Sequence, residues 1–161
     1  MDAFDEEILR FWNSLQVNNV EYIMVGGYAT NLNGYHRYTS DMDIWIRDTE
    51  ENRANLGNAM NELGYDNISW SEMQFIPGWI DFYLLNGMKL DILIDMKGLE
   101  NYTFDECLAV ATIAEIENVK VPFLHINHLI ANKKAVNRSK DQIDVMELEK
   151  IKLLRKEMGL D

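Results

Sequence analysis

The residues best suited to chemistry in this chain are two glycines followed by a pair of aspartates one residue apart. Gly26 and Gly27 follow the apolar run Tyr22–Val25, and Asp41 and Asp43 open a second apolar run. A glycine pair lets backbone N–H groups approach a phosphate closely. Two carboxylates at the start of an apolar strand are costly unless something binds them. The combination therefore indicates chemistry on a nucleotide through a divalent metal ion.

The two aspartates share one face of a strand predicted over 41–46. Side chains alternate along a strand, so the aliphatic residues between the acids face the core. Asp41 and Asp43 then project together, about 7 Å apart along the strand. In this arrangement both carboxylates can reach one hard cation, or share a pair of Mg²⁺ (or Mn²⁺) ions. The competing interpretation is an exposed strand edge that carries two solvated acids.

A third carboxylate is expected on the strand predicted over 89–96. Its aliphatic residues form the core face, which leaves Asp91 and Asp95 on the opposite face. An aspartate in so apolar a strand needs a partner, either a metal ion or a basic side chain from a neighbouring helix. We prefer Asp91 because it lies in the middle of the strand. Asp95, and Asp81 on the preceding predicted strand, are the alternatives.

A scaffold of mixed strands and helices must position these acids. Apolar periodicity, together with cap and turn residues, defines its elements. Helices are predicted over 4–15, 28–34, 49–63, 103–111, 125–136 and 139–158, and strands over 21–25, 41–46, 79–85, 89–96, 113–116 and 119–123. Asn86-Gly87 and Glu117-Asn118 are expected to be hairpin turns. The expected fold class is α+β: a central mixed, mostly antiparallel sheet with packed helices, two of them C-terminal.

Length and composition indicate a single folded domain over residues 1–161. The hydrophobic fraction of 47% is ample for a core. We expect 1–124 to form the sheet with its helices and 125–161 to form a C-terminal helical part. No stretch reaches the length of a membrane span, the N-terminus is acidic, and the one cysteine, Cys107, excludes an internal disulfide. These features predict a cytoplasmic protein.

Charge is distributed unevenly along the chain. The net charge is −12, which argues against extensive nucleic-acid binding because like charges repel. The segment 125–140 contains no acidic residue and carries +4, which leaves −16 on the remainder. A local basic site on an acidic body suits a small anion such as a triphosphate. The alternative is a solvated basic face, or pairing of these cations with Asp141 and Asp144.

These motifs together resemble the nucleotidyltransferase superfamily that shares the DNA polymerase β catalytic fold. The residues that carry the resemblance are Gly26-Gly27, Thr39-Ser40-Asp41-Met42-Asp43 and Asp91. The run from Leu129 to Asp144 is similar to a segment of small bacterial members related to abortive-infection and toxin–antitoxin nucleotidyltransferases. The resemblance covers roughly residues 20 to 145. Many small members have Gly-Ser where this chain has Gly26-Gly27.

The resemblance implies transfer of a nucleoside monophosphate from a nucleoside triphosphate to a hydroxyl group, with release of pyrophosphate. Asp41 and Asp43 would hold Mg²⁺ or Mn²⁺ against the phosphates, and Asp91 would bind a second metal ion or act as the base. The acceptor stays open among a protein side chain, a small molecule and an RNA end, and so does the oligomeric state. The alternative function is an antitoxin-like module that binds a toxin protein with weak or no catalysis.

The same resemblance implies a set of nucleotide-binding residues. Gly26 and Gly27 would cradle the β- and γ-phosphates, and Ser40 or Thr39 would offset the missing serine hydroxyl of the loop. Arg37 would contact phosphate or lie on the surface. The best candidate for a triphosphate lysine lies at the end of the first C-terminal helix, with further basic residues behind it. The full set is Gly26, Gly27, Arg37, Ser40, Lys133, Arg138 and Lys140.

Overall fold

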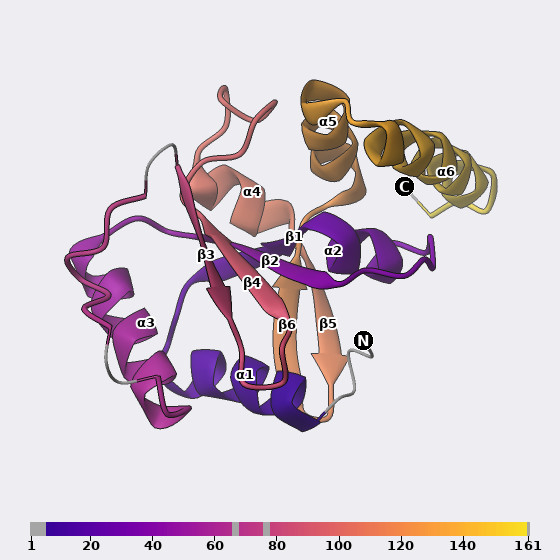
Figure 1. Cartoon of the computed structure of the whole chain (residues 1–161). Coiled ribbons are helices and arrows are strands. Elements are labelled where there is room, and N and C mark those ends of the chain that lie inside the picture. The colour runs from indigo at the N-terminus through magenta and orange to yellow at the C-terminus, as the bar shows by residue number, and fades with distance from the viewer. Residues whose placement is uncertain (1–5, 66–67, 76–77, 161) are drawn as a thin grey trace.

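The computed structural model describes residues 6–65, 68–75 and 78–160. Within these ranges the helices are α1 (Glu6–Val17), α2 (Gly26–Leu32), α3 (Glu50–Glu62), α4 (Phe104–Val110), α5 (Ile126–Val136) and α6 (Ser139–Glu157). The strands are β1 (Tyr22–Val25), β2 (Asp41–Ile46), β3 (Trp79–Tyr83), β4 (Lys89–Leu93), β5 (Thr112–Ile116) and β6 (Val119–Phe123). Figure 1 shows the strands across the middle of the molecule, with α1 below them, α3 at their left, and α5 and α6 above α2 at the upper right.

The six strands form one mixed sheet in the order β3-β4-β2-β1-β6-β5. The pairs β1–β2, β3–β4 and β5–β6 are antiparallel, whereas β1–β6 and β2–β4 are parallel. Both predicted hairpins are present. In the second, Glu117 and Asn118 have φ values of 49° and 70°, the left-handed pair that a two-residue type I′ turn requires. The predicted α+β class and mostly antiparallel sheet are confirmed.

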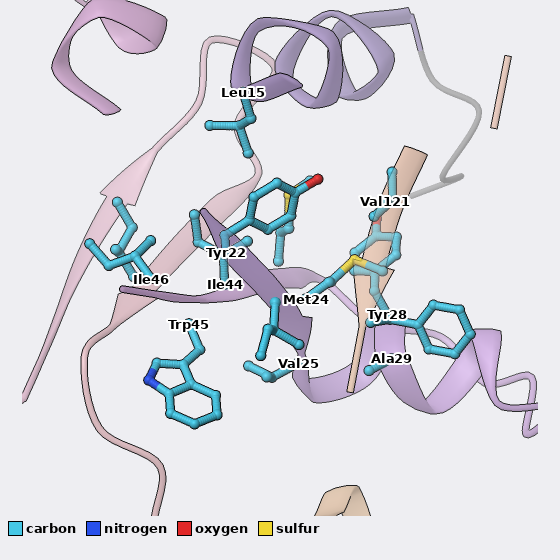
Figure 2. Packing of buried hydrophobic residues seen from close by; sticks show 14 of the residues in the cluster. Leu15, Tyr22, Met24, Val25, Tyr28, Ala29, Ile44, Trp45, Ile46 and Val121 are labelled. Carbon is cyan, nitrogen blue, oxygen red and sulfur yellow. The ribbon is translucent and has the colours of Figure 1, made fainter. Parts of the chain in front are cut away.

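A large part of the hydrophobic core fills the space between the sheet and α1. Leu15 of α1 points towards Tyr22 and Ile44 on the two central strands (Figure 2). The ring of Trp12 stacks on that of Tyr22, with the ring centroids 6.0 Å apart. Met42 and Ile44 are fully buried on the aliphatic face of β2, as strand alternation predicts. This packing fixes which face of β2 carries the acids.

Several element boundaries differ from the sequence prediction. Helix α2 begins at Gly26, two residues before the predicted start at residue 28, because the glycine pair forms the first turn of the helix instead of preceding it. Strands β3 and β4 end at Tyr83 and Leu93 rather than at 85 and 96; the hairpin closes when the Leu84 N–H donates to the Met88 carbonyl, 2.8 Å away. Helix α1 runs to Val17, and the predicted start at residue 4 lies outside the described residues.

Helix α5 is held against the loop that follows β4. At Gly98 (φ +87°) a Cβ would lie 2.6 Å from the carbonyl oxygen of Ala131, so the loop lies directly on α5. The side-chain amide of Asn132 donates to the carbonyl of Lys97 at 2.8 Å. Asn137 takes a left-handed conformation between the two helices. In the described part of the chain no helix combines the length and apolarity that a membrane crossing requires.

Candidate active site

Strand register brings the predicted acids together. In the parallel pair β2–β4, Asp43 lies opposite Asp91, and in the antiparallel pair β3–β4, Asp91 lies opposite Asp81. Three carboxylates therefore form a row across β2, β4 and β3, with Asp41 two residues before Asp43 on the same face. Asp95 lies beyond the end of β4. Among the alternatives, Asp91 is the acid that directly faces the Asp41–Asp43 strand.

The Asp43 carboxylate is costly to ionise in this setting. Burial raises its pKa to about 7, and the hydrogen bond and negative charge of Asp91 add to the shift, as does the charge of Asp41. The positive charge of Lys133 acts in the opposite direction. Asp91 Oδ1 is buried and accepts no hydrogen bond from any described residue. Two neighbouring acids, one of them buried and costly to ionise, indicate a place for a cation.

The glycine pair lies directly against these acids. Gly26 has φ +67°, and a Cβ at this position would overlap the carboxylate of Asp43. A Cβ at Gly27 would overlap the Thr39 hydroxyl and come within 3.3 Å of Arg37 Nη1. Only glycine combines the positive φ with this close approach. The backbone that was predicted to meet a phosphate therefore borders the candidate metal ligands.

The acids and Gly26 lie on one side of a cavity of about 830 Å³. The rest of the lining mixes apolar, aromatic and charged side chains, and comes from the start of β3, the end of β4 and the loop that follows it. The C-terminal part of α5 and the turn after it complete the boundary. Its apolar and aromatic members include Trp79, Leu93, Met96, Leu99, Tyr102 and Val136, and its polar and charged members include Lys89, Asp95, Lys97, Glu100, Asn132 and Arg138.

Three of the predicted nucleotide-binding cations meet two buried aspartates. Asp144 accepts two hydrogen bonds from Arg37, at 2.7 and 2.6 Å, and one from Lys133 Nζ at 2.7 Å. Asp141 pairs with Arg138 at 2.7 Å and with Lys133 at 3.6 Å. The pairing with Asp141 and Asp144 that the sequence left as an alternative is therefore present. The cluster carries three positive and two negative charges, and its excess charge lies near Asp43.

This buried network has a definite electrostatic signature. Burial alone would raise the pKa of Asp144, but the hydrogen bonds and charges of Arg37 and Lys133 outweigh it, so the pKa is lowered. The pKa of Asp141 is likewise lowered, because Arg138 and Lys133 outweigh its burial. Both carboxylates are therefore ionised at neutral pH and hold the helices α5 and α6 to the Arg37 loop.

The other predicted residues lie at the margin. Ser40 is exposed, and its hydroxyl donates to Asp41 Oδ1 at 3.2 Å. Lys140 is exposed at the start of α6. Sequence reasoning missed Lys89, whose ammonium lies 3.4 Å from Asp91 Oδ1. Its position two residues before Asp91, on the same face of the strand, was the available signal.

The donor set fits a hard cation, although the structure does not present a finished metal site. Among the described residues, no three His, Cys, Asp or Glu side chains converge closely enough to hold an ion. The acids in register, the Asp91 oxygen that accepts no hydrogen bond and the backbone packed against Asp43 are nevertheless suitable for one. Carboxylate oxygens are the ligands that Mg²⁺ and Mn²⁺ prefer.

Comparison with solved structures identifies the fold. No protein-family model and no curated protein sequence matches the chain. The lincosamide antibiotic adenylyltransferase LnuA, in its lincomycin-bound form, superposes with a TM-score of 0.62 at 16% identity, over 91% of this chain and 97% of its own. An antigenic nucleotidyltransferase-like protein from Paracoccidioides brasiliensis gives 0.54 at 17% identity, over 92% and 73%. ANT(2")-Ia in complex with adenylyl-2"-tobramycin gives 0.50 at 18% identity, over 92% of each chain. The chain therefore has the nucleotidyltransferase fold.

Proposed function

We propose that the protein transfers a nucleoside monophosphate from a nucleoside triphosphate to a hydroxyl group of an acceptor, with release of pyrophosphate. The observation that carries this proposal is the register of Asp43 with Asp91 beside Gly26, on a sheet with the nucleotidyltransferase fold. An acid pair with a closely packed glycine backbone matches the needs of a triphosphate and its metal ion.

In this proposal Asp41, Asp43 and Asp91 hold the divalent metal. When bound, Mg²⁺ or Mn²⁺ supplies positive charge to the triphosphate and lowers the pKa of the acceptor hydroxyl. As the alternative to a metal role, we expect Asp91 to take the hydroxyl proton, because it lies on the side of the row away from the glycines. Gly26 and Gly27 offer backbone N–H groups to the β- and γ-phosphates without a side chain in the way.

The basic residues divide into two groups in the same proposal. Arg37 and Lys133 are engaged with Asp144, so we expect them to fix α6 against the glycine loop. Arg138 lines the cavity, and its side chain is 58% exposed. We therefore expect Arg138 to be the cation that contacts phosphate oxygens, although it also pairs with Asp141.

We propose a small molecule as the acceptor. The cavity of about 830 Å³ falls within the range of roughly 300–1,000 Å³ that is typical of small-ligand pockets. Trp79, Leu99 and Tyr102 add apolar and aromatic surface to a lining that is otherwise rich in charged groups. Two proteins of the same fold were solved with small molecules, lincomycin and adenylyl-2"-tobramycin. The net charge of −12 disfavours a long RNA acceptor.

A label-transfer assay tests this function. The protein is incubated with Mg²⁺ or Mn²⁺, each α-³²P-labelled triphosphate, and separate panels of hydroxyl-bearing small molecules, RNA and protein. We expect transfer to a small molecule and a loss of about 100-fold or more in Asp43→Asn and Asp91→Asn. Asp48→Asn, a surface acid paired with Arg53, is the matched control and should keep full activity.

The assay also separates the antitoxin-like alternative, which stays a prediction. If the folded wild-type protein transfers no label to any panel and co-purifies stoichiometrically with a neighbouring gene product, the enzyme proposal is wrong. If Asp95→Asn abolishes transfer while Asp91→Asn does not, the third carboxylate has been assigned to the wrong residue.

A further inference from the structure

A lysine lies within the row of carboxylates. Lys89 is opposite Asp41 in the β2–β4 register. Its ammonium is 3.4 Å from Asp91 Oδ1 and 3.9 Å from Asp81 Oδ2, and its side chain is 28% exposed. A basic side chain among acids that are suited to a metal ion carries the charge that the ion would bring. Lys89 thus partly neutralises the row before any cation binds.

The contact between Lys89 and Asp91 is one of charge more than of hydrogen bonding. Asp91 Oδ1 is buried and receives no hydrogen bond from the described residues, although the ammonium is 3.4 Å away. A separation of this size is longer than the usual range for a hydrogen bond from nitrogen. Asp91 is therefore held by Lys89 without being saturated, and its oxygen stays available to a stronger ligand.

Lys89 also has alternative partners close to its ammonium group. Its ammonium lies 5.7 Å from the ring centroid of Trp79, and Asp81 is on the same strand as that ring. Both groups lie on β3, on the side of the row away from Gly26. A short rotation of the lysine side chain can transfer its charge from Asp91 to Asp81 and the aromatic face, where cations are also favoured.

We propose that Lys89 is a positioning residue that acts as the built-in counter-cation of Asp91. It pairs with Asp91 while the site holds no divalent ion, and it moves towards Asp81 and Trp79 when a divalent ion binds the row. This inference rests on the proposed function only in assigning Asp41, Asp43 and Asp91 to a divalent ion. Its consequence is a site whose affinity for the ion is kept low by a resident positive charge.

Direct metal binding in the absence of nucleotide tests the inference. Free Mn²⁺ is titrated by electron paramagnetic resonance against the wild type, Lys89→Met and Lys89→Arg. Lys97→Met is the matched control, because Lys97 lines the same cavity and its loss changes the net charge equally. We expect Lys89→Met to bind Mn²⁺ about tenfold more tightly, because charges a few ångströms apart interact strongly at a protein surface. Lys89→Arg and Lys97→Met should stay within about threefold of the wild type.

Three results would overturn the inference. Lys89→Met could bind Mn²⁺ no more tightly than the wild type, or Lys97→Met could tighten binding equally, which would make the effect one of general charge. A rise of tenfold or more in the KM for the triphosphate in Lys89→Met, with Mn²⁺ binding unchanged, would instead make Lys89 a phosphate contact. Label transfer is measured separately, so an inactive wild type with tighter Mn²⁺ binding in Lys89→Met would refute the proposed function and support this inference.

Discussion

Replacing Lys133 by methionine tests the buried ion-pair network that joins the C-terminal helices to the loop beside the glycines. Lys133 is only 4% exposed, and its ammonium lies 2.7 Å from Asp144 and 3.6 Å from Asp141. Methionine keeps most of the length and the apolar contact of lysine but removes the charge. Two buried carboxylates then share two cations instead of three.

The magnitude follows from the remaining partners. Removing one member of a buried ion pair costs about 3–5 kcal/mol. Because Arg37 still holds Asp144 and Arg138 still holds Asp141, we expect the lower end, about 3 kcal/mol of unfolding free energy. For a chain of this size, about 1 kcal/mol corresponds to roughly 2–4 °C in Tm. The variant should therefore melt about 6–12 °C lower than the wild type.

Thermal and urea unfolding, followed by circular dichroism, measure the effect. The adjacent Lys134→Met is the matched control, because Lys134 and its partner Glu149 have side chains 60% and 44% exposed. An exposed pair contributes at most about 1 kcal/mol. If the two variants lose the same stability, the buried network does not support the fold and the reasoning from burial is wrong.

The other predictions concern the glycine turn, pH and a helix cap. Gly26→Ala should cost about 1–2 kcal/mol for the positive φ and displace Asp43, so both urea unfolding and label transfer should show a loss; unchanged transfer would contradict the close approach. The pKa values of Asp141 and Asp144 are lowered in the folded state, so their contribution is complete above the unfolded value of about 3.9 and is lost as the pH falls through the folded values. The urea concentration at the midpoint of unfolding, measured from pH 6 to pH 2, should therefore fall once the pH is below about 4. The fall should be less steep in Lys133→Met. Thr103→Ala removes the N-cap of α4 and should lower the free energy of unfolding by about 1 kcal/mol, so the urea midpoint should fall. An unchanged midpoint would show that the cap does not stabilise the protein.

Local signals predicted the fold well. The Glu117-Asn118 turn sets its hairpin through φ preferences written in the turn itself. The β3–β4 hairpin instead closes over the three residues 85–87, with only Gly87 at positive φ, so Asn86-Gly87 located this turn without giving its type. Thr103 and Glu106 form a capping box at the start of α4, a spacing that can be read directly from the sequence. The C-terminal ends of β3 and β4 were predicted less well, because a strand ends where its partner strand stops pairing with it. The expectation of a single domain stays a prediction.

The site was predicted less completely, because its contacts are made between distant parts of the chain. Alternation placed Asp41 and Asp43 on one face, but only the register of β2 with β4 shows that Asp91 is the acid opposite Asp43. The burial of Lys133 depends on a helix packed against its own, and a basic segment alone does not reveal it. The catalytic and binding roles of these residues stay predictions for the assays above.

The ion pair between Arg37 and Asp144 spans 107 positions of sequence. Chains emerge from the ribosome N-terminal end first, at about 5–20 residues per second, so roughly 5–20 seconds separate the appearance of the two partners. During that interval the loop beside Gly27 has its arginine but not the carboxylate that holds it. The glycine side of the cavity therefore takes its final form only once α6 has been made, which places completion of the site among the late events of synthesis.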